Sequence, residues 1–255
     1  MSLKWLFAPL FVLLTSVAVC GQDDWSTKET SNYRILHKSN AEHAEKAARL
    51  VEEYHQKSVN RWFKGRCDWR TKCDIYLHPD TDSLSRFGSV GWNAPGYTQT
   101  ENDRSGVVII RRVHVRTDFK TVWEAVLPHE INHAVVAGRW GPGVHKWIDE
   151  GMAGQMEPDS VVAAHISTVK ANKDNLIAVG SLLAQKGYPR GQVNVFYAQS
   201  ITFVRYLVAL KGDEEFVSFV DSAVATDCER ALKKHYKLTP EEAETGWLKS
   251  VEDYK

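Results

Sequence analysis

The sequence predicts an α+β fold in which a small mixed or mostly antiparallel sheet precedes a helical C-terminal part. The main observation is a change of periodicity near residue 119. Before this point short runs of β-branched and aromatic residues alternate with a single helical pattern, and after it apolar residues recur at helical spacing. We therefore expect an N-terminal α/β part over residues 21–118 and a helical part over residues 119–255.

The composition is that of a folded globular protein. Of the 255 residues, 43% are hydrophobic and 25% are charged, which excludes a disordered chain. The formal net charge is zero, so the sequence predicts no nucleic-acid partner. The arginines at 111, 112 and 116 alternate with valines, a pattern typical of the solvated face of a strand.

The first twenty residues differ from the rest of the chain. An apolar run from Trp5 to Val19 follows Lys4, and it suits a secretory signal better than a membrane span. We expect residues 1–20 to be a signal peptide and the protein to be exported, either secreted or periplasmic. The segment also half resembles a lipoprotein signal, so a membrane partner is expected only if Cys20 is lipidated or the signal stays uncleaved.

Export affects the interpretation of the cysteines. Cys67 and Cys73 are close in sequence, and we expect them to form a disulfide in an oxidising compartment. Cys228 is left over, and its place in a helical pattern favours a buried thiol over a reactive one.

The N-terminal part contains a strand, helix, strand pattern. Residues 32–37 and 73–78 read as strands, and the helix between them is predicted to begin at a capping box of Ser39 and Glu42. Residues 88–106 are rich in Gly, Asn, Pro and Thr, and "GVVIIRRVHV" at 106–115 is the strongest strand signal in the chain. These segments predict a sheet of about four strands.

The helical part is divided by turn signals. Glycines and a proline at 138–143 and the segment "KGYPRG" at 186–191 separate helices. Gly212 ends one helix before Asp213 begins the next, and Thr239 with Glu242 forms a capping box for the last. Pro128 either begins a helix or kinks one that starts near Lys120, because proline suits only a first helical turn.

The segment "LPHEINHAV" at 127–135 contains a possible metal site. His129 and His133 stand one turn apart on the same helix face, so both imidazoles can reach one ion, and Glu130 lies beside them. The alternative explanation for this segment is a surface helix that carries two histidines and binds no metal. A catalytic zinc needs three protein ligands and one open position, so the hypothesis requires a third ligand.

The segment "HKWIDEGMA" at 145–153 offers three candidates for that ligand. His145, Asp149 and Glu150 are all chemically valid donors. Glu150 is the preferred one, because it follows a Gly-rich turn near the start of a second helix. A third histidine at the spacing of the metzincins is excluded, since Arg139 stands at that position.

These two segments together resemble the gluzincin metallopeptidases, and most closely the peptidase-MA-like family, in which HExxH is followed by WxxEGxA. The segment at 196–220 is also similar to the helical region of that family. The resemblance implies a zincin-like fold, one Zn²⁺ per chain and hydrolysis of an internal bond in a peptide or protein substrate. The sequence departs from the aminopeptidases of the group because it lacks their Gly-Ala-Met-Glu-Asn segment.

The resemblance also implies roles for individual residues. His129, His133 and Glu150 would bind zinc, and Glu130 would act as the general base on the zinc-bound water. Tyr197 would stabilise the oxyanion, although an aromatic-rich helix also explains it as a core residue.

Three further expectations complete the hypothesis. Asp149 is either a partner of a zinc-bound histidine or an ordinary residue of a first helical turn. Residues 105–113 are expected to form the edge strand that pairs with an extended substrate. The alternative function is a non-catalytic envelope or surface binding protein that retains a peptidase-like fold.

Overall fold

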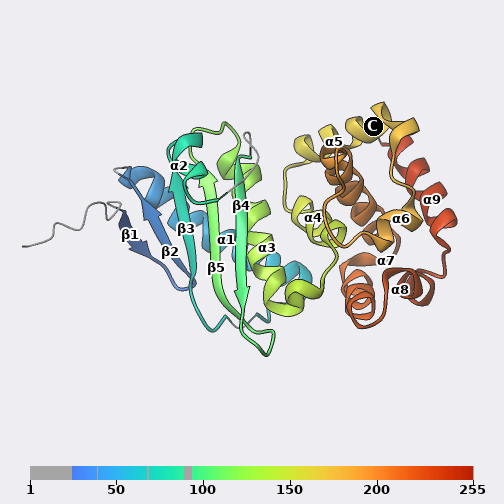
Figure 1. The fold of residues 1–255 in the computed structure, drawn as a ribbon, viewed down its shortest axis with the longest axis horizontal. Coiled ribbons are helices and arrows are strands. Elements are labelled where there is room, and N and C mark those ends of the chain that lie inside the picture. The colour runs from blue at the N-terminus through green and yellow to red at the C-terminus, as the bar shows by residue number, and fades with distance from the viewer. Residues whose placement is uncertain (1–24, 39, 68, 89–93, 255) are drawn as a thin grey trace, which may run out of the picture.

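The computed structural model describes residues 25–38, 40–67, 69–88 and 94–254. The expected signal peptide at residues 1–20, with Cys20, lies outside the described residues, as does Ser39. The described chain has an α+β architecture, with a sheet in its N-terminal half and helices in its C-terminal half (Figure 1). This confirms the predicted α+β class with a small sheet before a helical C-terminal part.

In the described residues the sheet is mixed and has five strands in the order β1-β2-β3-β5-β4. The three central strands run parallel, and the edge strands β1 and β4 run antiparallel to their neighbours. The strands are β1 (Ser26–Glu29), β2 (Tyr33–His37), β3 (Cys73–His78), β4 (Gly96–Asn102) and β5 (Val108–Arg116). The sheet therefore has one strand more than the sequence predicted.

The prediction that residues 105–113 form the edge strand is wrong. This segment contributes to β5, which hydrogen-bonds to β3 on one side and to β4 on the other. The edge beside the helices is β4, in the stretch of residues 88–106 for which the sequence predicted no strand. β4 reads "GYTQTEN" and carries no β-branched apolar residue, so its composition gives a weak strand signal.

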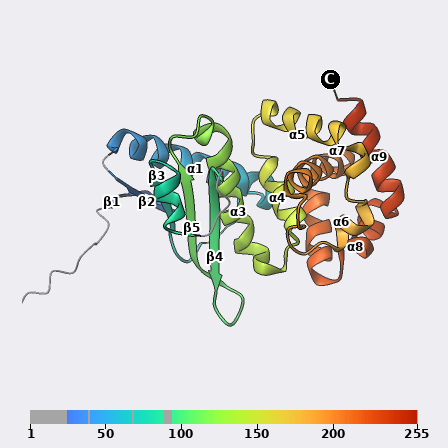
Figure 2. The same cartoon turned by 45° about the horizontal axis from the view of Figure 1, so that its top comes forward.

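Helices α1 (Ala41–Phe63) and α3 (Leu127–Trp140) cover one face of the sheet (Figures 1 and 2). The face of α1 that contains Ala44, Ala47 and Val51 is fully buried, as its spacing predicted. The helix begins at Asn40, whose side chain accepts a hydrogen bond from the backbone N–H of His43. The predicted cap at Ser39 with Glu42 is therefore wrong by one residue, because the capping residue is Asn40.

A π-helical turn at Val122–Val126 leads directly into α3. Pro128 lies in the first turn of α3, a position that suits the fixed φ of proline. Each of the two alternatives for Pro128 is therefore partly right. The helical path starts before Pro128, and the regular α-helix begins at Leu127.

The C-terminal half is a layer of helices around α7. The helices are α4 (Lys146–Gly154), α5 (Asp159–Ala171), α6 (Val179–Ala184), α7 (Val193–Ala225), α8 (Cys228–Tyr236) and α9 (Pro240–Glu252), and the short α2 (Thr81–Ser85) lies with the sheet. Gly212 interrupts α7 with a positive φ of 84°, and the Thr239–Glu242 capping box begins α9, both as predicted.

α7 is the one helix in the described residues that is long and apolar enough to cross a membrane by length and composition. Half of its most apolar window is buried inside the protein. Phe203 and Phe219 of α7 both pack against the ring of Trp147 in α4. These contacts are those of the central helix of a packed layer.

The disulfide expected between Cys67 and Cys73 is not formed in the structure. Cys73 opens β3 with its side chain completely buried, and burial raises the pKa of its thiol. A buried thiol forms little of the thiolate that disulfide chemistry requires. Cys228 is buried at the start of α8, as predicted.

Candidate metal centre

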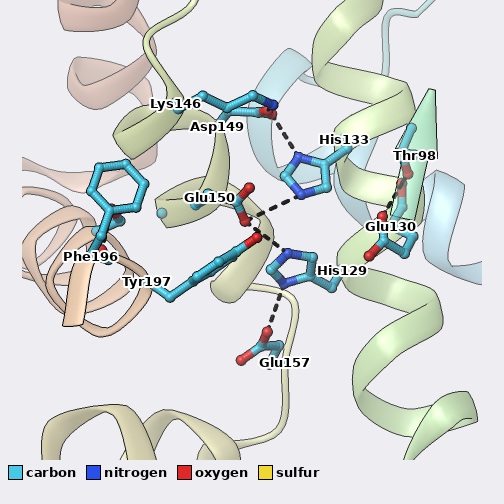
Figure 3. Close-up of polar contacts among 12 residues, drawn as sticks. Thr98, His129, Glu130, His133, Lys146, Asp149, Glu150, Glu157, Phe196 and Tyr197 are labelled. Atoms are coloured by element: carbon cyan, nitrogen blue, oxygen red, sulfur yellow. Dashed lines mark hydrogen bonds and ion pairs between the residues drawn. The ribbon is translucent and has the colours of Figure 1, made fainter. Parts of the chain in front are cut away.

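The two histidines of the HExxH segment lie side by side on α3. Their ring centroids are 4.8 Å apart, and both side chains are nearly buried, with about a tenth of their surface exposed. The Nε2 atoms of both rings point toward the same carboxylate across the gap to α4 (Figure 3). The spacing of the two histidines thus brings both imidazoles to one point, as the sequence predicted.

That carboxylate belongs to Glu150. Its Oε2 lies 3.2 Å from Nε2 of His129 and 3.5 Å from Nε2 of His133. One ligand atom from each of the three residues lies within 4.8 Å of the others. Two imidazoles and one carboxylate therefore form a group that could hold a metal ion.

The other two candidates for the third ligand point elsewhere. His145 precedes the first turn of α4, and its Nδ1 lies 3.5 Å from the Cys228 thiol. The carboxylate of Asp149 lies 2.7 Å from Nδ1 of His133, which is the ring nitrogen that faces away from Glu150. The structure therefore favours Glu150 among the three.

Each residue of this group has a second polar partner. Glu157 lies 2.7 Å from Nδ1 of His129, and Asp149 makes the equivalent contact with His133. The hydroxyl of Tyr188 donates a hydrogen bond to Oε1 of Glu150. Such partners fix the orientation and tautomer of metal-binding side chains in known metalloproteins.

The electrostatics of the group favour positive charge between α3 and α4. Burial alone lowers the pKa of His133, but the charges of Asp149 and Glu150 outweigh burial and raise that pKa to about 9. Burial also lowers the pKa of His129, but the hydrogen bonds to Glu150 and Glu157 together with the charges of these carboxylates outweigh burial and raise that pKa. A site that stabilises imidazolium in this way also suits a divalent cation, so charge and donor chemistry both fit a metal.

Glu130 faces the same space from the neighbouring position of α3. Its side chain is 7% exposed, and burial raises the pKa of its carboxyl. The hydroxyl of Thr98, on the edge strand β4, lies 2.7 Å from Oε2 of Glu130 and 3.0 Å from its backbone oxygen. Glu130 is therefore held beside the group without being one of its three members.

Tyr197 approaches the group from α7. Its hydroxyl lies 3.4 Å from that of Tyr188, and Figure 3 shows its ring directed toward Glu150 and His129. Its neighbour Phe196 is fully buried. Phe196 is thus the core residue of this aromatic pair, whereas Tyr197 faces the candidate metal group.

A cavity of about 380 Å³ connects these side chains. His129, Glu130, His133 and Glu150 form one wall of the cavity. β4 and the loop between α6 and α7 also line the cavity, through Tyr97, Thr98, Thr100, Lys186 and Tyr188. The candidate metal group is therefore accessible from outside.

Sequence reasoning did not identify four polar residues of the site. Thr98 lies in an unassigned polar stretch, and Tyr188 lies in the loop "KGYPRG", which was interpreted only as a helix break. Glu157 follows α4, and Lys146 donates to Asp149 over 2.7 Å. The only indication of a role for Glu157 in the sequence was its acidic side chain seven positions after Glu150.

Comparison of the sequence with protein-family models and with curated proteins gives no match. The function must therefore be argued from the geometry of the site itself.

Proposed function

We propose that this chain is an exported zinc metallopeptidase of gluzincin type with a zincin-like fold. The observation that carries the proposal is the convergence of His129, His133 and Glu150 on one point, with Glu130 facing the same cavity. Two imidazoles and one carboxylate are a donor set of catalytic zinc sites, and they leave a coordination position open. Export rests on the apolar segment at residues 1–20.

In this proposal His129, His133 and Glu150 hold the zinc ion. When bound, zinc supplies a Lewis acid that makes water acidic near pH 7 and polarises the carbonyl of a substrate. The partners Glu157 and Asp149 keep both Nε2 atoms directed at the ion, because they engage the opposite ring nitrogens.

Glu130 is the general base of the proposed reaction. Its carboxylate is next to the ligands in the chain and is oriented by Thr98, so it can accept a proton from water and deliver it to the leaving amine. Burial raises its pKa, which makes the carboxylate a stronger base than one in solvent. The Tyr197 hydroxyl faces the position where negative charge would develop on the substrate.

β4 is the proposed binding edge for an extended peptide. Its partner β5 occupies one side, and the other side borders the cavity through Gly96, Thr98 and Thr100. An extended substrate can add to such an edge through main-chain hydrogen bonds. The role expected for residues 105–113 is thus transferred to the neighbouring strand.

The decisive test of this function is a comparison of the wild type with Glu130→Gln on a peptide library. Removal of the base should lower kcat by at least about 100-fold and leave zinc content unchanged, because Gln retains the shape of the side chain. Turnover that survives the substitution would contradict the role of Glu130 as the base. A zinc-loaded wild type that cleaves no peptide would favour the non-catalytic binding protein.

A further inference from the structure

Tyr188 reaches the candidate metal group from a separate part of the chain. It lies in the loop of residues 185–192 between α6 and α7, where its side chain is 45% exposed. Despite this exposure its hydroxyl donates to Oε1 of Glu150, which is itself buried. The hydrogen bond therefore connects a surface loop to the third candidate ligand.

Three neighbours hold the Tyr188 ring in place. Tyr197 stacks against it at a centroid distance of 5.8 Å, and Phe196 packs edge-on at the same distance. The ammonium group of Lys146 lies 5.7 Å from the ring centroid. These contacts fix the direction of the hydroxyl, so the bond to Glu150 does not depend on the loop backbone alone.

The two oxygens of Glu150 consequently have different environments. Oε1 accepts the hydrogen bond from Tyr188, whereas Oε2 is the atom closest to both imidazoles. A carboxylate held in this way presents one oxygen to an ion and has little freedom to rotate. The two histidines obtain their partners from α4 and the turn that follows it, but Glu150 depends on a loop more than thirty residues away.

We propose that Tyr188 is a positioning residue for the metal, which fixes Glu150 as a ligand through one oxygen. The hydroxyl of Tyr197 donates to that of Tyr188 over 3.4 Å, so the short hydrogen bond to Glu150 comes from Tyr188. This inference rests on the proposed zinc function. Tyr188 lies outside both the HExxH and the WxxEGxA segments.

The test compares Tyr188→Phe with the matched variant Tyr197→Phe. Both substitutions remove one hydroxyl and keep the ring, and thermal unfolding of the metal-free proteins checks that both variants fold. The zinc dissociation constant is measured by competition with a chromophoric chelator. We expect Tyr188→Phe to weaken zinc binding by about 10- to 100-fold, as for other partners of ligands, and Tyr197→Phe to change it by less than about twofold.

A second readout separates positioning from catalysis. Peptide turnover by Tyr188→Phe should recover as buffered free zinc is raised, whereas turnover by Tyr197→Phe should stay low at every zinc concentration. Equal zinc affinity of Tyr188→Phe and wild type overturns the inference and leaves the proposed function intact. A wild type that binds no zinc overturns both.

Discussion

At the scale of single residues, the orientation of Glu130 depends on one hydroxyl. Thr98 lies within hydrogen-bond distance of both the carboxylate and the backbone oxygen of Glu130. This contact links the edge strand β4 to the residue after the first histidine of α3. A general base must be held in a defined direction to act on a proton, so in the proposed reaction Thr98 would orient Glu130.

We expect Thr98→Val to lower kcat by about tenfold and to reduce stability by about 1 kcal/mol, because a hydrogen bond to a buried group is lost. Zinc affinity should not change, since none of the three candidate ligands contacts Thr98. Steady-state kinetics and zinc titration check both parts. Thr98→Ser is the control because it retains the hydroxyl, and a loss in Thr98→Ser as large as in Thr98→Val would contradict this role.

The three candidate ligands could be predicted from the sequence because helical periodicity places them. His129 and His133 share a face by their spacing, and Glu150 lies in the next helix, which follows a Gly-rich turn. Thr98 and Tyr188 could not be predicted. They reach the site only because β4 and the loop before α7 pack against it. The local sequence pattern does not predict such tertiary contacts.

At the scale of elements, the position of Glu150 depends on close packing between α4 and α7. A methyl group added to Gly151 would lie 2.2 Å from Cγ2 of Val204 and 2.6 Å from the backbone oxygen of Ser200. Gly154, one turn later, is equally close to the Ile201 side chain. The glycine after the third ligand in the WxxEGxA pattern therefore has a packing explanation here.

We predict that Gly151→Ala lowers the free energy of unfolding by about 2 to 4 kcal/mol, because the backbone of α7 cannot yield to the added methyl group. The matched control is Gly180→Ala in α6, where the nearest atom would be 3.7 Å away. That variant should be neutral or slightly stabilising, since alanine favours a helix. Chemical denaturation measures both, and equal stability of the two variants would refute the packing argument.

The sequence predicted the central strands and not the edges. β2, β3 and β5 carry alternating apolar residues that enter the core, and these gave clear strand patterns. β1 reads "STKE" and β4 reads "GYTQTEN". Edge strands often carry polar residues that discourage association, so their patterns are weak for a physical reason.

At the scale of the whole molecule, the sheet face opposite α1 and α3 is closed by an aromatic cluster with two buried histidines. Nε2 of His78 lies 3.0 Å from Nδ1 of His114, and the ring of His114 is stacked between Tyr76 and Tyr97. Burial lowers the pKa of His114 to about 3, and the nearby charges of His78 and Arg112 add to this effect. Burial and Lys38 lower the pKa of His78 to about 4, against a smaller opposing effect of Asp80.

These two histidines should make the protein sensitive to acid. Each has a lower pKa in the folded than in the unfolded protein, so below pH 6.5 the unfolded chain binds more protons and the free energy of unfolding falls. At pH 5 the loss is on the order of 2 kcal/mol for each histidine. Denaturation of wild type and His114→Phe from pH 7 to 5 should give a shallower decline in the variant. An unchanged slope would show that the histidine does not control acid stability.

The candidate metal centre joins the two halves of the molecule. His129 and His133 lie on α3, which packs on the sheet, whereas Glu150 lies on α4, which packs on α7 (Figure 1). A bound ion would therefore connect the sheet to the helical layer and stabilise the whole fold by mass action. Every part of the proposed function depends on whether these three residues bind one ion together.

The most direct measurement of this claim is the zinc content of the purified protein, for wild type beside His133→Ala and Glu150→Ala. The account predicts about one zinc per chain in the wild type and loss of the metal in both variants, since a catalytic site needs all three ligands. A wild type that carries no zinc and takes up none on titration would contradict it, and α3 would then be a helix with two histidines and no metal.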